Sequence, residues 1–246
     1  MTISANSLET EIEYPDSDGQ PMTESDPTRD YLIYSVSVLE LFFKARSDVY
    51  VSGNLFVYYE RGVPAAVVSP DVFVVIGVEK KKRRSYKAWE EGNIMPAFVL
   101  EITSKTTQEN DEIDKPRKYQ SLGVLEYFQY DPTGDYLRPA LKGSRLQNGQ
   151  YQPIPEVASS ENERVLFSEA LGLELRLNQG ELRFYNPQTG ERLLSYDETE
   201  QARQQAEQAR QNAVSRLLAM GLSAEQVAEA LEMSLEQVNQ LGSDSI

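Results

Sequence analysis

The sequence predicts a mixed-sheet α/β domain (α+β in its later part) followed by a helical extension. Two short apolar runs, SPDVFVVIGV at 69–78 and PAFVLEI at 96–102, have the length and the β-branched and aromatic content of buried strands. A polar segment with helical spacing joins the second run to a third, GVLEYFQYDP at 123–132. After Tyr196 the composition changes abruptly to Ala, Glu, Gln and Arg, which is typical of a long exposed helix.

The composition narrows the possible chemistry. The 246 residues suit one α/β domain with an appendage. Because the chain contains no cysteine and no histidine, it cannot build a Ser-His-Asp triad, a histidine-ligated zinc site or a thiolate site. Asp, Glu, Lys, Tyr and Arg remain, together with a metal that prefers oxygen ligands, such as Mg²⁺ or Mn²⁺.

The net charge and the N-terminal segment indicate where the protein is located and what it binds. The formal net charge of −15 argues against polyanion binding by the surface as a whole, although it allows a local basic cleft. No apolar run reaches transmembrane length, and the N-terminus lacks the basic-then-apolar order of a signal peptide. We therefore expect a cytoplasmic protein with no membrane partner and no nucleotide cofactor. Residues 1–27 are polar, acidic and aperiodic, which predicts a flexible arm.

Residues 28–196 form the predicted main domain. Its first helix, from Thr28 to about residue 48, has an apolar face made of Leu32, Val36, Leu39 and Phe43. Residues 49–62 form a strand pair or a bent strand that breaks at 52–54, and a helix over 108–122 ends at Gly123 before a strand at 125–130. Four turn signals, at 131–134, 148–149, 178–180 and 186–190, predict hairpins over 137–194.

Residues 197–246 form the predicted helical extension. Its first helix carries an alanine seam that would pair closely with another helix, as in a coiled-coil homodimer; the seam is formed by Ala202, Ala206, Ala209, Ala213 and Leu217. Capping-box starts at Ser223 and Ser234 predict two short helices that resemble a helix-turn-helix. The second of these, LEQVNQLG, has no Lys or Arg to meet phosphates, which favours a cap or a dimerisation tail over a DNA reader.

Two acidic residues lie within apolar runs of the sequence. Asp71 opens VFVVIGV and Glu101 lies inside AFVLEI, and a carboxylate on a buried strand loses hydration unless something pairs with it. A divalent cation held by both carboxylates, with the backbone carbonyl of Ile102 as a third ligand, is one solution. The alternative is an Asp satisfied by turn amides and a Glu that faces solvent.

A metal held by these acids could hydrolyse a phosphodiester, and that reaction also needs a positive group near the attacking water. Three lysines stay open as candidates for this group. The position two residues after Glu101 on the same strand face is Thr103, and Lys105 lies one step further out. A following helix would instead deliver Lys115, which shares a face with Asp111 and Tyr119. Lys118 lies about a hundred degrees from that face. We therefore rank Lys115 first, Lys118 second and Lys105 third.

A run of five cations separates the two acidic strands. Lys80, Lys81, Lys82, Arg83 and Arg84 are followed by Tyr86, Lys87 and Trp89. One interpretation is a solvated loop. The other is a phosphate-binding element beside the acids, with Lys87 among its cations and an aromatic ring that stacks on a base.

Glu40 and Glu60 are further candidate acids for the site.

The ordered set SPDVFVVIGV, FVLEITS, D-x-x-x-K-x-x-x-Y over 111–119 and GVLEYFQYDP resembles the Uma-two family of endonucleases. That family is similar to the restriction-endonuclease-like PD-(D/E)XK superfamily, and the resemblance covers roughly Leu32 to Leu194. It implies that Asp71 and Glu101 bind the metal and that Lys115 replaces the lysine usually found two residues after the Glu. The departure at Thr103 is shared by the family.

These observations predict a Mg²⁺- or Mn²⁺-dependent endonuclease that hydrolyses DNA. The cation activates the attacking water, while Lys115, or one of the other two lysines, assists at the phosphate. One alternative keeps the fold without catalysis, as a module that binds nucleic acid or a protein. A second alternative is an assembly protein that works through its alanine-seamed tail.

Overall fold

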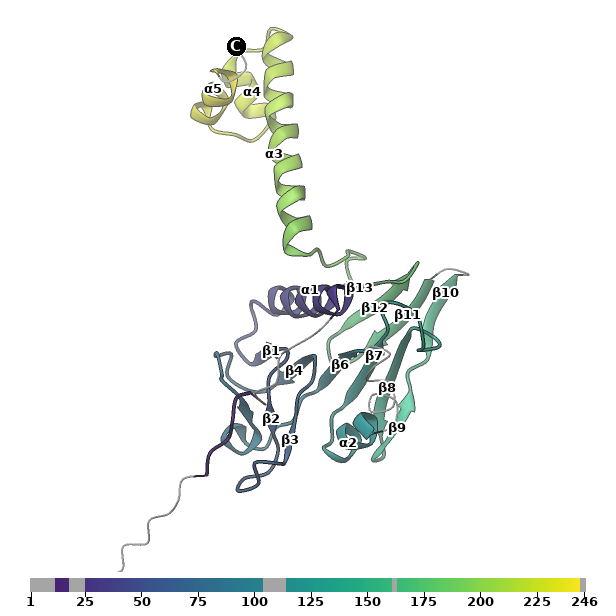
Figure 1. Ribbon diagram of the computed structural model, residues 1–246. Helices are drawn as coiled ribbons and strands as arrows, with labels where there is room; N and C mark the ends of the chain where they lie inside the picture. Colours follow the sequence, from purple (N-terminus) through teal and green to yellow (C-terminus); the bar gives the residue numbers. More distant parts are fainter. Residues whose placement is uncertain (1–11, 18–24, 104–113, 161–162, 244–246) are drawn as a thin grey trace, which may run out of the picture. The chain divides into compact units, whose positions relative to one another are not determined.

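The computed structural model describes residues 12–17, 25–103, 114–160 and 163–243. The chain separates into two compact units, Met1–Leu193 and Leu194–Ile246 (Figure 1). The described part of the first unit contains three β-sheets, and that of the second contains helices only. None of the described helices combines the length and the apolar content needed to cross a bilayer.

The main sheet of the first unit has six strands. In chain order they are β1 (Val49–Ser52), β4 (Val72–Ile76), β6 (Phe98–Ile102), β7 (Glu126–Tyr130), β8 (Leu141–Gln147) and β9 (Gln150–Pro153). Their order in space is the same as their order in the chain. β6 and β7 run parallel, and the other neighbours run antiparallel. The two acidic runs are therefore adjacent inner strands, as the sequence predicts, and the fold is mixed α/β.

A helix connects the two parallel strands. α2 (Lys115–Ser121) follows β6 and precedes β7, because a parallel connection needs a crossover rather than a tight turn. Pro116 lies in the first turn of α2, where its missing N–H leaves no hydrogen bond unmade. Gly123, at φ +77°, ends the helix as predicted. The part of the predicted helix before Asp114 lies outside the described residues.

One helix covers the first strands. α1 (Asp26–Phe42) begins where the Ser25 side chain accepts a hydrogen bond from the Thr28 N–H, and it packs against β1, β4 and β6. Leu39 and Phe43 are buried in the core, whereas Leu32 and Val36 are partly buried at its edge. The predicted apolar face is thus confirmed, and it closes one side of the sheet.

A small second sheet covers the opposite side. It consists of β2 (Val57–Tyr58), β3 (Val67–Val68) and β5 (Tyr86–Lys87) in the order β3-β2-β5, and β5 leads into a 3₁₀ helix, η1 (Ala88–Glu91). The predicted break at 52–54 is where the chain leaves β1 for this sheet, with Asn54 at φ +47°. Tyr86 and Phe73 belong to the second core that fills the space between the sheets.

The predicted hairpins both extend the main sheet and form a third one. β8 and β9 extend the main sheet through a turn at Asn148-Gly149, where φ is +51° and +79°. β10 (Glu156–Ser160), β11 (Glu163–Ser168), β12 (Leu173–Asn178) and β13 (Glu181–Tyr185) then form an antiparallel meander. Its last turn, Gln179-Gly180, also has positive φ at both residues.

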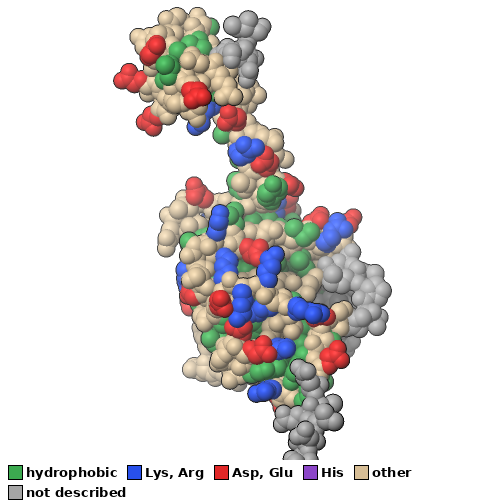
Figure 2. Space-filling model, turned by 90° about the vertical axis from the view of Figure 1, so that its left-hand side faces the viewer, with side chains coloured by type: hydrophobic (Ala, Val, Ile, Leu, Met, Phe, Trp, Pro, Cys, Tyr) green, Lys and Arg blue, Asp and Glu red, His purple; other side chains and the backbone are tan. Residues whose placement is uncertain are grey.

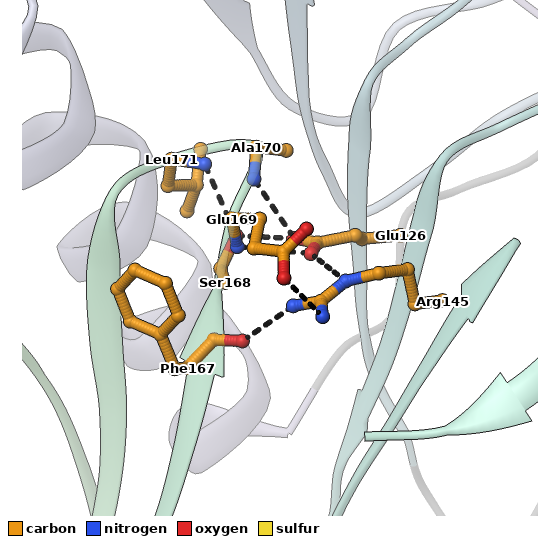
Figure 3. Close-up of polar contacts among 7 residues, drawn as sticks. All are labelled: Glu126, Arg145, Phe167, Ser168, Glu169, Ala170 and Leu171. Carbon is orange, nitrogen blue, oxygen red and sulfur yellow. Dashed lines mark hydrogen bonds and ion pairs between the residues drawn. The ribbon is translucent and has the colours of Figure 1, made fainter. Parts of the chain in front are cut away.

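A buried carboxylate joins the main sheet to the meander (Figure 3). Glu126 on β7 is 1% exposed, and its Oε1 accepts hydrogen bonds from Arg145 Nε at 2.8 Å and from the Glu169 N–H at 2.9 Å. Ser168 Oγ donates to Glu126 Oε2. Arg145 also donates to the Phe167 carbonyl at 2.9 Å. Because every polar group in this cluster has a partner, the buried charge stabilises the junction of the two sheets.

The second unit is a small helical assembly. α3 (Tyr196–Ala219) begins with a capping box formed by Ser195 and Glu198, and the predicted capping box at Ser223 opens α4 (Ala224–Ala230). α5 (Leu235–Ser243) follows. Val214, Val227 and Val238, one from each helix, form its buried core. Residues 201–210 of α3 are exposed, so most of the alanine seam lies outside the buried core of this unit.

Candidate active site

The register of β4 and β6 brings the two acids together. Val72 on β4 lies opposite Leu100 on β6 in the antiparallel pair, and one further step places Asp71 opposite Glu101. Directly opposed residues of an antiparallel pair project their side chains to the same face. The two carboxyl groups therefore share one face at one end of the sheet, where β4 begins and β6 ends.

Asp71 is held by the backbone of the neighbouring strand. Its Oδ2 accepts a hydrogen bond of 2.7 Å from the Ile102 N–H. Burial, followed by the nearby Glu101 carboxylate, raises the pKa of Asp71 well above its ordinary value, although Lys115 and the Ile102 N–H act in the opposite direction. One lysine thus does not balance the two acids, and the pair retains excess negative charge that favours a cation or a proton.

Glu101 has a partner on each oxygen. It is 0% exposed, which requires compensation for its charge. Lys115 Nζ lies 2.8 Å from Oε2, and the Tyr119 hydroxyl donates to Oε1 at 2.7 Å. Burial raises the pKa of Tyr119, with Glu101 as the next cause, so this hydroxyl stays a donor at neutral pH. Both partners come from α2, one turn apart, because residues i and i+4 of a helix share a face.

The structure distinguishes Lys115 from Lys118. Lys115, at the start of α2, contacts Glu101 directly. The ammonium of Lys118 lies 4.5 Å from the centre of the Tyr59 ring instead. Lys105 and Asp111 lie outside the described residues. Thr103, at the usual lysine position, is buried, and its hydroxyl donates to the Tyr130 carbonyl.

A close backbone approach supports Asp71, and no local pattern in the sequence indicates it. The Asn54 N–H donates to the carbonyls of Pro70 and Asp71 at 3.1 and 3.2 Å. A Cβ at Gly53 would lie 2.4 Å from the Asp71 carbonyl oxygen, so only glycine fits there. The sequence predicts a strand break at 52–54. Its position against Asp71 follows only from the way β1 pairs with β4.

A cavity opens beside the acidic pair. It has a volume of about 460 Å³ and lies between β3 and the start of α2. Its lining consists of Val67, Val68, Ser69, Asp114, Lys115, Lys118 and Tyr119. Lys115 and Tyr119 thus contact Glu101 and also line this cavity, so they lie between the cavity and the buried acid.

The donor set fits a hard divalent cation. Asp71 and Glu101 supply carboxylate oxygens on one face, and each oxygen that already accepts one hydrogen bond keeps a second lone pair. The Thr103 N–H points to Tyr130 on β7. Across that trans peptide the Ile102 carbonyl points the opposite way, toward the Asp71 side.

Among the described residues, no third acidic ligand lies near the pair. Within the described ranges, no three acidic side chains come close enough together to hold a metal. Glu40 and Glu60, the further candidate acids, are both exposed. The candidate ligands for a cation among the described residues are therefore the two carboxylates and the Ile102 carbonyl, and water would complete the coordination that Mg²⁺ prefers.

The basic loop lies away from the acids, which corrects its expected position beside them. β4 runs from Asp71 at one end of the sheet to Ile76 at the other, and the loop follows Ile76. The start of the loop is hydrogen-bonded to the segment before β1: the Gly77 N–H donates to the Asp48 carbonyl, and the Lys80 N–H donates to the Ser47 carbonyl. Five strand residues span roughly 17 Å, so the loop begins about that far from Asp71.

The cations of this loop have different surroundings. The Arg83 side chain is 6% exposed; it bonds to Glu91 at 3.0 Å and lies 4.3 Å from the centre of the Tyr50 ring, which makes it part of the fold. Lys80 donates to the Phe43 carbonyl, while Lys81 pairs with Glu79 and Glu91. Lys82 and Arg84 are exposed. On the face of this unit shown in Figure 2, basic side chains are interspersed with acidic ones.

These features define a class of protein: a mixed-sheet domain with two acids on adjacent strands and a lysine delivered by the crossover helix. Residues 6–179 match the model of the Uma2 family, described as "Putative restriction endonuclease". The chain belongs to this family, and the resemblance seen in the sequence is thereby confirmed.

Two further comparisons complete this result. No curated protein matches the chain. Among solved structures, the chain is similar to a "putative nuclease belonging to DUF820" from Anabaena variabilis, with 16% identity, coverage of 57% of this chain and 75% of the other, and a TM-score of 0.40.

Proposed function

We propose that this protein is a divalent-metal-dependent endonuclease that hydrolyses phosphodiester bonds of DNA at the Asp71–Glu101 pair. The observation that supports it best is the convergence of Asp71, Glu101 and Lys115 beside an open cavity. A buried acidic pair with a single lysine is a costly arrangement, and such costs are concentrated at functional sites. Membership in a family described as restriction endonucleases favours the same chemistry.

Each residue has a defined part in this proposal. Asp71, Glu101 and the Ile102 carbonyl hold Mg²⁺ or Mn²⁺. A bound cation supplies positive charge that acidifies water and offsets the charge developing at phosphorus. Lys115 orients Glu101 and places a second positive charge at the cavity wall, where it attracts the phosphate. Tyr119 fixes the other oxygen of Glu101.

Cleavage of supercoiled plasmid and of labelled oligonucleotides, with Mg²⁺ or Mn²⁺ and with a chelator, tests the proposal. We expect cleavage by the parent with metal, none with chelator, and none from Asp71→Asn or Glu101→Gln. Glu60→Gln, which changes an exposed acid, is the matched control and should cleave like the parent. If the parent is inactive with every substrate and metal, or if Asp71→Asn cleaves at the parental rate, the proposal fails.

A further inference from the structure

The N-terminal segment at residues 12–17 packs on the second sheet and on η1. The Tyr14 ring lies edge-on to Tyr58, with 5.1 Å between ring centres, and 5.0 Å from the Trp89 ring. Lys87 Nζ lies 5.2 Å from the centre of the same Tyr14 ring. The Tyr14 hydroxyl accepts a hydrogen bond from the Gly62 N–H. A polar, acidic segment thus places its one aromatic ring in a slot formed by two aromatic rings and a cation.

The next two residues complete the contact. The Tyr58 hydroxyl donates to the Pro15 carbonyl. Arg84 approaches Asp16 Oδ2 with two nitrogens, Nη2 at 2.5 Å and Nε at 2.7 Å. This arginine lowers the pKa of Asp16, so the carboxylate is charged at neutral pH. The Asp16 carboxylate therefore binds Arg84, and it follows by two residues the Tyr14 ring that fills the aromatic slot.

The surface matches the chemistry of a single nucleotide. Trp89 and Tyr58 present aromatic rings that a base can contact, as the Tyr14 ring does edge-on to Tyr58 and at 49° to Trp89, and Lys87 adds a cation beside the ring. The Arg84 guanidinium supplies the planar fork that binds a phosphate. The Tyr14 ring lies where the base would contact these two rings, and the Asp16 carboxylate lies where the phosphate would bind.

We infer that Tyr58, Arg84, Lys87 and Trp89 form a binding site for single-stranded nucleic acid, and that the Tyr14–Asp16 segment occupies this site in the free protein. The inference rests on the proposed function for its ligand class and adds a place outside the acidic pair where the strand is held. A base in duplex DNA is stacked on its neighbours and is not available to this slot, so an unpaired strand is the ligand.

Occupation by the segment lowers the affinity for the strand. A competitor carried on the same chain acts at a high effective concentration at this site. The apparent dissociation constant rises in inverse proportion to the fraction of molecules with a vacant site. Removing the Tyr14 ring or the Asp16 charge raises that fraction, so either change should tighten binding.

Trp89 is the only tryptophan in the chain, so its fluorescence reports on this site alone. The test is a fluorescence titration with a single-stranded oligonucleotide in chelator, so that no cleavage occurs. We expect quenching of Trp89 by the parent and roughly tenfold tighter binding by Tyr14→Ala and Asp16→Asn. The matched control is Glu13→Gln, which removes one charge from an exposed neighbour and should bind within about twofold of the parent.

Arg84→Ala and Lys87→Ala, placed in the Tyr14→Ala background, should each weaken binding severalfold. Three results would overturn the inference: parental affinity in both Tyr14→Ala and Asp16→Asn, binding of the oligonucleotide without any change in Trp89 fluorescence, or equal binding of a duplex of the same sequence. A change in thermal unfolding alone would show that the segment is a structural tether. Failure of the nuclease proposal appears separately, as absence of metal-dependent cleavage.

Discussion

Lys115 and Glu101 are joined across the gap between β6 and α2, with Lys115 Nζ 2.8 Å from Glu101 Oε2. The Lys115 side chain is 25% exposed whereas that of Glu101 is 0% exposed, so one cation links a fully buried acid to the adjoining cavity. This pair provides a direct test among the candidate lysines.

Lys115→Ala should reduce metal-dependent cleavage by about 10² to 10⁴, the range typical of a lost catalytic charge. Lys118→Ala should keep most of the activity, because its ammonium faces Tyr59 rather than Glu101. Lys105→Ala is the third variant, and circular dichroism checks folding of all three. If Lys115→Ala cleaves normally while either of the others is inactive, the assignment of the lysine is wrong although the nuclease chemistry survives.

Asp71→Asn should stabilise the metal-free protein, and more so as the pH rises. The raised pKa of Asp71 means that the folded chain holds a proton which the unfolded chain releases nearer the ordinary value. Stability is therefore complete at low pH and is lost as the pH rises through the folded-state pKa. Thermal unfolding from pH 4 to 8 measures this, and a difference between parent and variant that is independent of pH would contradict it.

The same variant tests metal binding without an activity assay. A cation that binds only the folded parent adds about 2.7 kcal/mol at a hundred times its dissociation constant. Mn²⁺ should therefore raise the melting temperature of the parent and should have little effect on Asp71→Asn. Glu60→Gln, an exposed acid, should respond like the parent. An equal response of parent and Asp71→Asn would place the bound metal elsewhere.

Tyr119→Phe should lower the cleavage rate about tenfold while preserving the fold, because Glu101 loses the donor that holds Oε1. The stability cost should be about 1 kcal/mol for the lost hydrogen bond. Tyr151→Phe removes a different, partly buried hydroxyl, which donates to the Val124 carbonyl. This control should lose similar stability with unchanged cleavage. Equal effects of both variants on cleavage would assign Tyr119 a purely structural role.

Arg145→Ala should destabilise the first unit by roughly 3–5 kcal/mol, because it leaves the Glu126 carboxylate buried without its cation. Urea unfolding gives the change in free energy, and cleavage by the remaining folded fraction should be unaffected. Arg46→Ala removes an arginine whose pair with Asp48 is exposed, and its effect should be much smaller. Similar losses for the two arginines would mean that the junction is not a stabilising contact.

Removal of everything after Tyr196 should convert a dimer to a monomer and leave the first unit folded, if the alanine seam pairs two copies. Residues 201–210 of α3 are exposed, which leaves small side chains available for a second helix. Light scattering measures the mass. Ala206→Glu should have the same effect with the tail intact, and an unchanged mass in both variants would remove the dimer hypothesis.

Local sequence patterns predicted several strands, the apolar face of α1 and the turns. β4, β6 and β7 fall within the predicted apolar runs, and α1 has its predicted apolar face. The hairpin turns and the end of α2 at Gly123 have the expected positive φ values. These features depend on near neighbours in the chain: side-chain periodicity, turn residues with special φ, and helix capping.

Three features depended on tertiary structure. The acids Asp71 and Glu101 are thirty residues apart, and only the β4–β6 register puts them on one face. The approach of Gly53 to the Asp71 carbonyl requires β1 to lie beside β4. The expected position of the basic loop was wrong because a loop that joins two strands can leave from the end remote from the site, and β4 does so.

The sequence by itself limited the kinds of chemistry that are open to this protein. Without histidine or cysteine, two acids on apolar strands and a choice of lysines leave an oxygen-ligated cation as the natural partner. Only the tertiary structure decided that Lys115 contacts Glu101 and that the Tyr14 segment lies on Trp89. The physical reason is that residue types limit what a side chain can do, whereas contacts between distant residues depend on strand register and on packing that no local pattern encodes.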